Sequence, residues 1–307
     1  DKDQLASVEA GSVLADMCDS EIPHGFSQSK LNMLQKISGQ TLEKSELEAH
    51  GAGIRDHLCQ LRVSYRFHEK SGIGHLARAA NEGDYQAWLK VQNNGYEDLS
   101  LSGFNHDALA DFIKNAAHIY TDYLDRLTPT DTSDALVLDI HQHFNDFQIL
   151  CALRSGLQGV VAVNEMIEQS LQHLGKIQPQ GLWYAGRPIM VMENDYGLNL
   201  YNGDIAIILP KIEEGKMRLK AAFISTDRKV RWVQCSRLPK HETVFAMTVH
   251  KSQGSEFNHC ALMLPDYISP VLSKELIYTG ITRAKKHLSL IASPHIIKQG
   301  LGQKVQR

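Results

Sequence analysis

The alternation of hydrophobic and polar residues predicts strands and helices that follow one another along the chain. Residues 147–153 form a short apolar run of the kind expected of a strand buried on both faces of a sheet, and residues 244–249, 260–264 and 287–292 also have the character of buried strands. Residues 160–174 have helical spacing between the first two runs. Because parallel strands need a crossover connection, usually a helix, this order predicts a parallel α/β sheet.

The N-terminal part of the chain is predicted to be mainly helical. Residues 28–50 and about 72–128 have helical periodicity, and Asn105 or Asp107 is placed to cap one of these helices. A further helix is predicted over about 273–284, between the last two apolar runs. These helices would supply the layers that flank the sheet.

A change in composition marks residues 181–240. Four strand-like segments, RPIMVME, DIAIILP, MRLKAAFI and VRWVQC, are separated by turn signals such as Asn202-Gly203-Asp204 and Glu214-Gly215. Short strands joined by tight turns pair antiparallel. We therefore expect a small β-barrel inserted between elements of the larger α/β domain.

The composition is that of a globular protein. Of the 307 residues, 43% are hydrophobic and 22% are charged. No apolar run reaches the ~18 residues of a membrane span, and no secretory leader is present, so the cytoplasm is the expected compartment and no membrane partner is expected. The net charge of -3 neither favours nor excludes nucleic acid, so any DNA binding must come from a local groove.

Cysteine and histidine do not indicate a metal site. The cysteines occur singly, without a CxxC pair, and are interpreted as small buried hydrophobic residues rather than as disulfide partners or zinc ligands. The 15 histidines include no HExxH motif. We therefore expect no bound metal ion from the residues of this chain.

Three short segments carry most of the chemistry: SYRF at 64–67, TVHKSQGSEF at 248–257 and YTGITRA at 278–284. Arg66 would end a strand that begins near residue 57, and Arg283 would lie in a helix that ends at a sheet edge. The rigid donor fork of arginine suits phosphate oxygens and stabilises the charge that develops in phosphoryl transfer. Taken singly, each arginine is better explained as a surface ion pair. The second segment carries many hydrogen-bond donors close together, which favours a ligand-binding site there.

These segments resemble motifs IV, V and VI of the superfamily 1 helicases, and the opening DKDQL resembles motif III. Three further segments, ASVEAG, ILCALRSG and GRPIMVMENDYGLNLYNGD, narrow the resemblance to the RecD family, that of the α subunit of exonuclease V. The resemblance spans nearly the whole chain and is weakest over about 12–55 and 75–135. It implies part of an ATP-dependent DNA helicase.

The resemblance also implies a domain organisation. The α/β domain would be a RecA-like motor lobe of the P-loop NTPase type, the second of two, interrupted by an SH3-like β-barrel. Residues 1–55 would form the end of the first lobe and a helical connection. Residues 56–180 and 241–307 would form the second lobe in two parts, and residues 181–240 would form the barrel.

Residue roles follow from the resemblance, motif by motif. Gln4 would sense the γ-phosphate of ATP, and Arg66 and Arg283 would reach that phosphate across the cleft between the lobes. Gly254 and Glu256 would line the nucleotide side of motif V.

The other half of the motif V segment would face single-stranded DNA. Thr248, His250 and Lys251 are the expected DNA-binding residues, with Arg154 as a weaker candidate. The resemblance further implies 5′–3′ translocation and RecB and RecC subunits as partners, with RecC as the direct contact.

The phosphate-binding loop is missing from the sequence. No GxxxxGK[ST] pattern occurs, because Gly175-Lys176 is followed by Ile177 and Gly215-Lys216 by Met217. ATP with Mg²⁺ would therefore be bound mainly by a lobe outside this sequence, and we expect no ATP hydrolysis by this chain alone.

Two other interpretations stay open. A stand-alone RecD-like helicase or a conjugative relaxase-helicase would share these motifs, and a degenerate lobe would act only in DNA binding or as a scaffold. The chain opens at Asp1 without a methionine, which we interpret as a start inside a longer protein. A docking domain upstream would favour a RecD subunit, and a nuclease domain a relaxase.

Overall fold

The computed structural model describes residues 1, 3–5, 25–41, 54–59, 70–128, 131–179 and 181–303. It divides into two units, residues 1–68 with 306–307, and residues 69–305. Arg66 and most of the strand predicted from residue 57 lie outside the described residues.

The first unit contains the helix α2 (Gln28–Ser38) and the short 3-10 helix η2 (Ile54–His57). The side chain of Ser27 caps α2 and also donates to the carboxylate of Asp56, with 2.6 Å between Oγ and Oδ2. The helix predicted from 28 to 50 is interrupted at Gly39, which ends α2 in the left-handed conformation with φ 70°, and residues 42–50 lie outside the described residues.

The second unit is built on a parallel sheet of five strands, which confirms the predicted α/β class. The order across the sheet is β1 (Leu99–Ser102), β10 (Ala284–Ile291), β9 (Phe257–Met263), β2 (Phe147–Cys151) and β8 (Ala246–Thr248). All the pairings are parallel. Every residue of β2 is buried, as its apolar run predicts.

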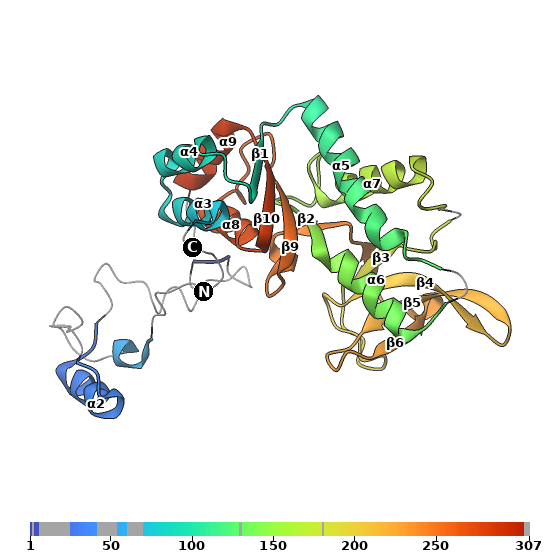
Figure 1. Ribbon diagram of the computed structural model, residues 1–307, viewed down its shortest axis with the longest axis horizontal. Coiled ribbons are helices and arrows are strands. Elements are labelled where there is room, and N and C mark those ends of the chain that lie inside the picture. The colour runs from blue at the N-terminus through green and yellow to red at the C-terminus, as the bar shows by residue number, and fades with distance from the viewer. Residues whose placement is uncertain are drawn as a thin grey trace. The chain divides into compact units, whose positions relative to one another are not determined.

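Helices flank the sheet on both faces (Figure 1). One group consists of α3 (Gly72–Glu82), α4 (Tyr85–Asn93), α8 (Lys274–Ile281) and α9 (Pro294–Gly302). The other consists of α5 (His106–Leu124), α6 (Asp134–Asp146) and α7 (Val160–His173). Asn105 caps α5 as predicted, by accepting from the backbone N–H of Ala108. The strand β1 interrupts the predicted helical stretch over 72–128.

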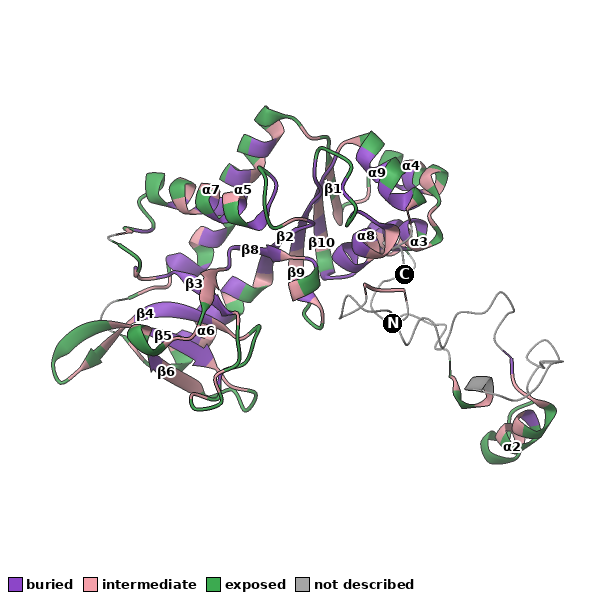
Figure 2. Ribbon diagram, turned by 180° about the vertical axis from the view of Figure 1, so that it is seen from behind, coloured by how far each residue is buried: buried purple, intermediate pink, exposed green. Residues whose placement is uncertain are grey.

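A second, antiparallel sheet occupies the region where a barrel was expected. Its order is β6 (Val230–Gln234), β5 (Lys216–Ile224), β4 (Ile205–Glu213), β3 (Pro188–Val191) and β7 (His241–Thr243). This antiparallel sheet has a hydrophobic core of its own, to which β3, β4 and β5 supply buried residues that include Ile189, Ile208 and Phe223. Figure 2 shows the purple, buried segments of both sheets.

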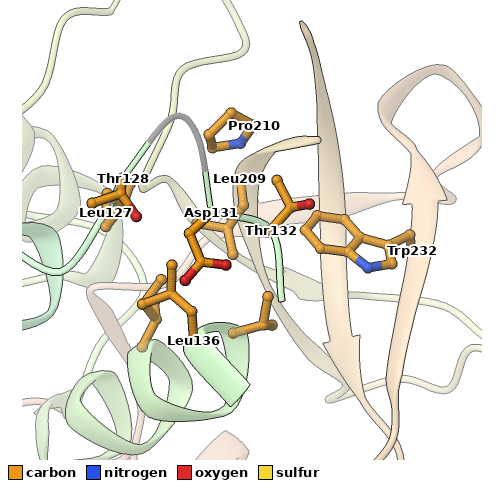
Figure 3. A pocket seen from close by; sticks show the side chains of 10 residues that line it. Leu127, Thr128, Asp131, Thr132, Leu136, Leu209, Pro210 and Trp232 are labelled. Carbon is orange, nitrogen blue, oxygen red and sulfur yellow. The ribbon is translucent and has the colours of Figure 1, made fainter. Parts of the chain in front are cut away.

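The antiparallel sheet also packs against α6. Leu136, Leu209 and Trp232 lie around a cavity of about 10 Å³ at this contact (Figure 3). The ammonium of Lys211 lies 4.6 Å from the centre of the Trp232 ring. A cavity of this size holds no more than about one water molecule, so we interpret it as a packing contact between sheet and helix rather than as a ligand-binding pocket.

The two sheets are joined almost directly. β7 passes into β8 through Val244 and Phe245, both of which are buried. The carbonyl of Phe245 accepts hydrogen bonds from the buried hydroxyl of Tyr120 and from Nε2 of Gln148. Buried polar side chains of α5 and β2 therefore fix the joint between the sheets.

The open edge of β8 is also satisfied by a side chain. Asn164 on α7 accepts from the N–H of Ala246 and donates to its carbonyl, each at 3.0 Å. The amide of Asn164 thus takes the place of a neighbouring strand at this position.

Candidate functional site

The segment 249–256 connects the two ends of the parallel sheet. Thr248, the last residue of β8, is level with Cys151 and Met263, the last residues of β2 and β9. Phe257 begins β9 at the opposite end, so residues 249–256 run back from the carboxyl edge of the sheet to its amino edge. The residues predicted to face DNA begin this connection, and those predicted to face the nucleotide end it.

Arg283 lies at the amino edge, after α8 and before β10. Its side chain is only 3% exposed. Its Nε donates to the carbonyl of Thr279 at 3.2 Å, one terminal nitrogen to the carbonyl of Ser255 at 3.1 Å, and the other to the hydroxyl of Thr282 at 3.4 Å. Such burial argues against a solvated surface ion pair. Arg283 instead ties α8 to the end of the 249–256 connection.

The last residues of the connection are more open. Gly254 has φ +83°, and a Cβ added there would meet nothing within 4 Å, so its backbone can be approached closely. The carboxylate of Glu256 lies 3.8 Å from the ammonium of Lys285, and both side chains are partly exposed. Lys285 was missed in the sequence, although it follows Arg283 by two residues.

An open polar groove of about 530 Å³ adjoins this corner. It is lined by residues of α6, by the start of β4, by the β5–β6 turn, and by Glu256, Asn258 and Lys285. The antiparallel sheet therefore borders the amino edge of the parallel sheet directly.

At the carboxyl edge, Thr248 and Lys251 are in contact. The hydroxyl of Thr248 accepts from the backbone N–H of Lys251 at 3.3 Å, and the ammonium of Lys251 donates to Oδ1 of Asn202 at 2.8 Å. His250, between them, is exposed. Asn202 was interpreted only as a turn residue, because its partner lies far away in the sequence.

Arg154 follows β2 at the same edge. Its side chain is 57% exposed and pairs with Glu242 of β7 at 2.9 Å. The structure thus places Arg154 on the side predicted for DNA, where it also links the loop after β2 to the antiparallel sheet.

The sequence of this chain is similar to those of known helicase proteins. Residues 243–291, which include Thr248, Glu256 and Arg283, match the family model of the UvrD-like helicase C-terminal domain. The whole chain is 35% identical over 322 residues to the RecBCD enzyme subunit RecD of Haemophilus influenzae and 32% identical over 309 residues to that of Mycobacterium tuberculosis. The chain is a RecD-like superfamily 1 helicase sequence. It spans about half the length of the curated relatives it matches, 48% and 46% for these two.

Other matches of the RecD-like chain are more distant. It is 28% identical over 141 residues to the ATP-dependent RecD2 DNA helicase of Deinococcus radiodurans, covering 45% of this chain and 19% of that protein. Among solved structures, it aligns with the Pif1 helicase from Bacteroides in complex with ADP-AlF3 and ssDNA. That alignment has 16% identity and a TM-score of 0.32, and covers 59% of this chain and 48% of the other.

Gln4 belongs to the first unit of the RecD-like chain. Its side-chain amide donates to the carboxylate of Asp1 at 3.2 Å. The roles proposed for Gln4 and Arg66 therefore stay predictions.

Burial shifts the pKa values of other titratable groups near the parallel sheet. Burial, together with the neighbouring His287, lowers the pKa of His259 to about 4. Burial also raises the pKa of the Cys151 thiol to about 12. Cys151 and Cys260 are buried, as predicted, whereas Cys59 is exposed.

Within the described residues, no group of three or more metal-ligating side chains comes together. Nor is any helix of that part long and apolar enough to cross a membrane.

Proposed function

We propose that this chain is the C-terminal motor region of an ATP-dependent 5′–3′ DNA helicase, a RecD-like subunit of a RecBCD-type helicase and nuclease that acts in double-strand break repair and recombination. The observation that carries the proposal is the path of residues 249–256. One short connection joins the candidate DNA-binding residues at one edge of the sheet to the candidate nucleotide-binding residues at the other.

The donor set at the amino edge fits one side of a nucleotide. The partly exposed ammonium of Lys285 suits phosphate oxygens, and the carboxylate of Glu256 can accept from a hydroxyl. The buried guanidinium of Arg283 would reach a phosphate by exchanging its hydrogen bonds to Thr279, Thr282 and Ser255. Bound ATP with Mg²⁺ would supply the phosphoryl group whose transfer to water drives the motor. The P-loop that holds it would come from another lobe, because this sequence contains none. We therefore propose that this chain alone hydrolyses no ATP.

The carboxyl edge would contact single-stranded DNA through Thr248, His250, Lys251 and Arg154. A change in the position of Glu256 on nucleotide binding would act on Thr248 through the backbone of residues 249–256. Because Arg283 fixes one end of that connection, the two edges would respond together.

RecB and RecC subunits are the partners proposed here, with RecC in direct contact. The similarity to relatives called RecBCD enzyme subunit RecD supports this proposal. The RecD2 match favours, as a second candidate, a stand-alone helicase. A DNA-binding scaffold without catalysis is the third.

The test is ATP hydrolysis stimulated by single-stranded DNA, measured on the full-length polypeptide that carries this chain. Arg283→Ala should lower turnover by roughly 10³-fold or more, as expected for an arginine finger. Arg218→Ala, an exposed arginine of β5, is the matched control. Both variants are assayed well below their unfolding temperatures. Unchanged turnover in Arg283→Ala would refute a catalytic role and favour the scaffold.

A further inference from the structure

The loop between β3 and β4 is a small, firmly built hairpin. Asp195 and Leu200 exchange two backbone hydrogen bonds of 2.8 and 2.9 Å, and the carboxylate of Asp195 accepts from the N–H of Leu198 at 3.0 Å. Arg231 of β6 donates to the carbonyls of Leu198 and Asn199, at 2.6 and 2.9 Å. The backbone of the loop is therefore held from inside and from the neighbouring sheet.

This hairpin displays two tyrosines on its surface. Tyr196 is 74% exposed and Tyr201 is 48% exposed, although both are large aromatic side chains. Their rings meet edge to face, with centroids 6.3 Å apart and planes at 75°. A pair of exposed rings on a fixed backbone gains little by burial, so a binding role explains it better than a packing role.

The hairpin is attached to the connection between the two edges of the parallel sheet. Asn202, next to Tyr201, accepts from the ammonium of Lys251, and its N–H donates to the side chain of Asn194 at 2.8 Å. Asn194 also contacts the hydroxyl of Tyr196, at 3.4 Å. A short hydrogen-bonded chain thus leads from Lys251 to Tyr196, and Tyr201 is the sequence neighbour of Asn202 in that chain.

We propose that Tyr196 and Tyr201 form a stacking platform for the bases of single-stranded DNA that passes over Lys251. The inference rests on the proposed function, because it takes Lys251 as a backbone contact. Single-stranded nucleic acid is bound by cations that follow its phosphates and by aromatic rings on which its bases stack, and these residues supply both beside one another. Tyrosine is also common in protein–protein interfaces, and the experiment below distinguishes a protein partner from single-stranded DNA.

The experiment measures binding of the full-length polypeptide to oligothymidylate and to an abasic oligonucleotide of the same length and charge. Tyr196→Ala and Tyr201→Ala should each weaken oligothymidylate binding by about 5- to 150-fold, the effect of losing one base–aromatic stack. Abasic binding should be unchanged, because its contacts are made by phosphates. Tyr→Phe at either position should retain wild-type binding.

Met217→Ala is the matched control, since Met217 is 63% exposed on the same antiparallel sheet. Alanine variants that bind both oligonucleotides like wild type would overturn the platform and leave the proposed function intact. Equal losses on both oligonucleotides would also overturn it, since they would indicate a distorted loop. If oligothymidylate binding persists while co-purification with partner subunits is lost, the tyrosines contact protein instead. A wild-type protein that binds neither oligonucleotide would refute the proposed function itself.

Discussion

Arg283 stabilises the contact between two segments of the fold, independently of any role in catalysis. Its guanidinium donates to oxygens on Thr279, Thr282 and Ser255, and these bonds join α8 to the segment before β9. Removing the guanidinium takes one donor from each of these acceptors, although the carbonyl of Thr279 still accepts from the hydroxyl of Thr282. The stability of the fold is therefore sensitive to this residue, and under the proposed function catalysis would be sensitive to it as well.

Arg283→Ala should lower the free energy of unfolding by about 2–4 kcal/mol, because the buried carbonyl of Thr279 and the partly buried carbonyl of Ser255 each lose a donor and a cavity forms. Urea denaturation of the chain measures the loss. Arg218→Ala should shift it by less than about 0.5 kcal/mol. Equal stability in the two variants would contradict the contacts described for Arg283.

His141 makes the fold sensitive to acid. Burial lowers its pKa from 6.5 to about 4, and its Nε2 lies 2.9 Å from the carbonyl of Ala222. The unfolded chain therefore takes up a proton first between pH 6.5 and 4. The stabilisation is fully present above pH 6.5 and decreases by about 3 kcal/mol as the pH falls toward 4.

Replacing His141 by Gln keeps a donor for Ala222 and removes the titration. The pH dependence of the unfolding free energy between pH 7 and 4 should become shallower in this variant. The exposed His173→Gln is the control. A slope in His141→Gln equal to that of wild type would show that other groups dominate the acid response.

Among the elements, β8 depends most on a single side chain. Its outer edge is satisfied at Ala246 by the amide of Asn164, which is 6% exposed. Asn164→Ala leaves a buried N–H and a buried carbonyl without these partners, and should destabilise the chain by about 2–5 kcal/mol. Asn145→Ala, at an exposed position of α6, should have an effect within about 0.5 kcal/mol. Thermal unfolding of both variants and of wild type measures the two losses of stability, and equal losses would contradict the role of Asn164.

The sequence predicts those elements whose pattern is local. Mainly apolar stretches predicted β2, β9 and β10, and burial is greatest in the predicted parts of β9 and β10, whereas Lys285 and Lys286 near the start of β10 are exposed. β1 and β7 were missed, since LSLS and HET are short and become strands only through partners distant in the sequence. The end of α2 could have been predicted from Gly39, a residue that favours the left-handed cap.

The same distinction applies to the candidate site. Thr248, Glu256 and Arg283 lie within contiguous motifs and were identified by them. The contacts of Lys251 with Asn202 and of Arg154 with Glu242 cross between the sheets, so no local pattern contains them. Burial of Arg283 is also a tertiary property.

At the scale of the whole molecule, a net charge of -3 leaves DNA affinity to a few local cations. Lys251→Gln should weaken single-strand binding and reduce the slope of log K against log salt by about 0.7, as expected for the loss of one phosphate contact. Lys216→Gln, at the exposed β4–β5 turn, is the control. Titrations of the full-length polypeptide at several salt concentrations measure the slope. A slope that Lys251→Gln leaves unchanged would exclude a phosphate contact there.

The joint between β7 and β8 gives the molecule a mechanical property. Since only Val244 and Phe245 separate β7 from β8, and buried side chains bond to both, this connection between the sheets offers no hinge. The small sheet would move as one body with the larger sheet, so a rotation of the parallel sheet would carry with it the tyrosine hairpin, which is also bonded to Lys251 through Asn202. Slow amide exchange should accordingly be lost from the two sheets in a single opening event.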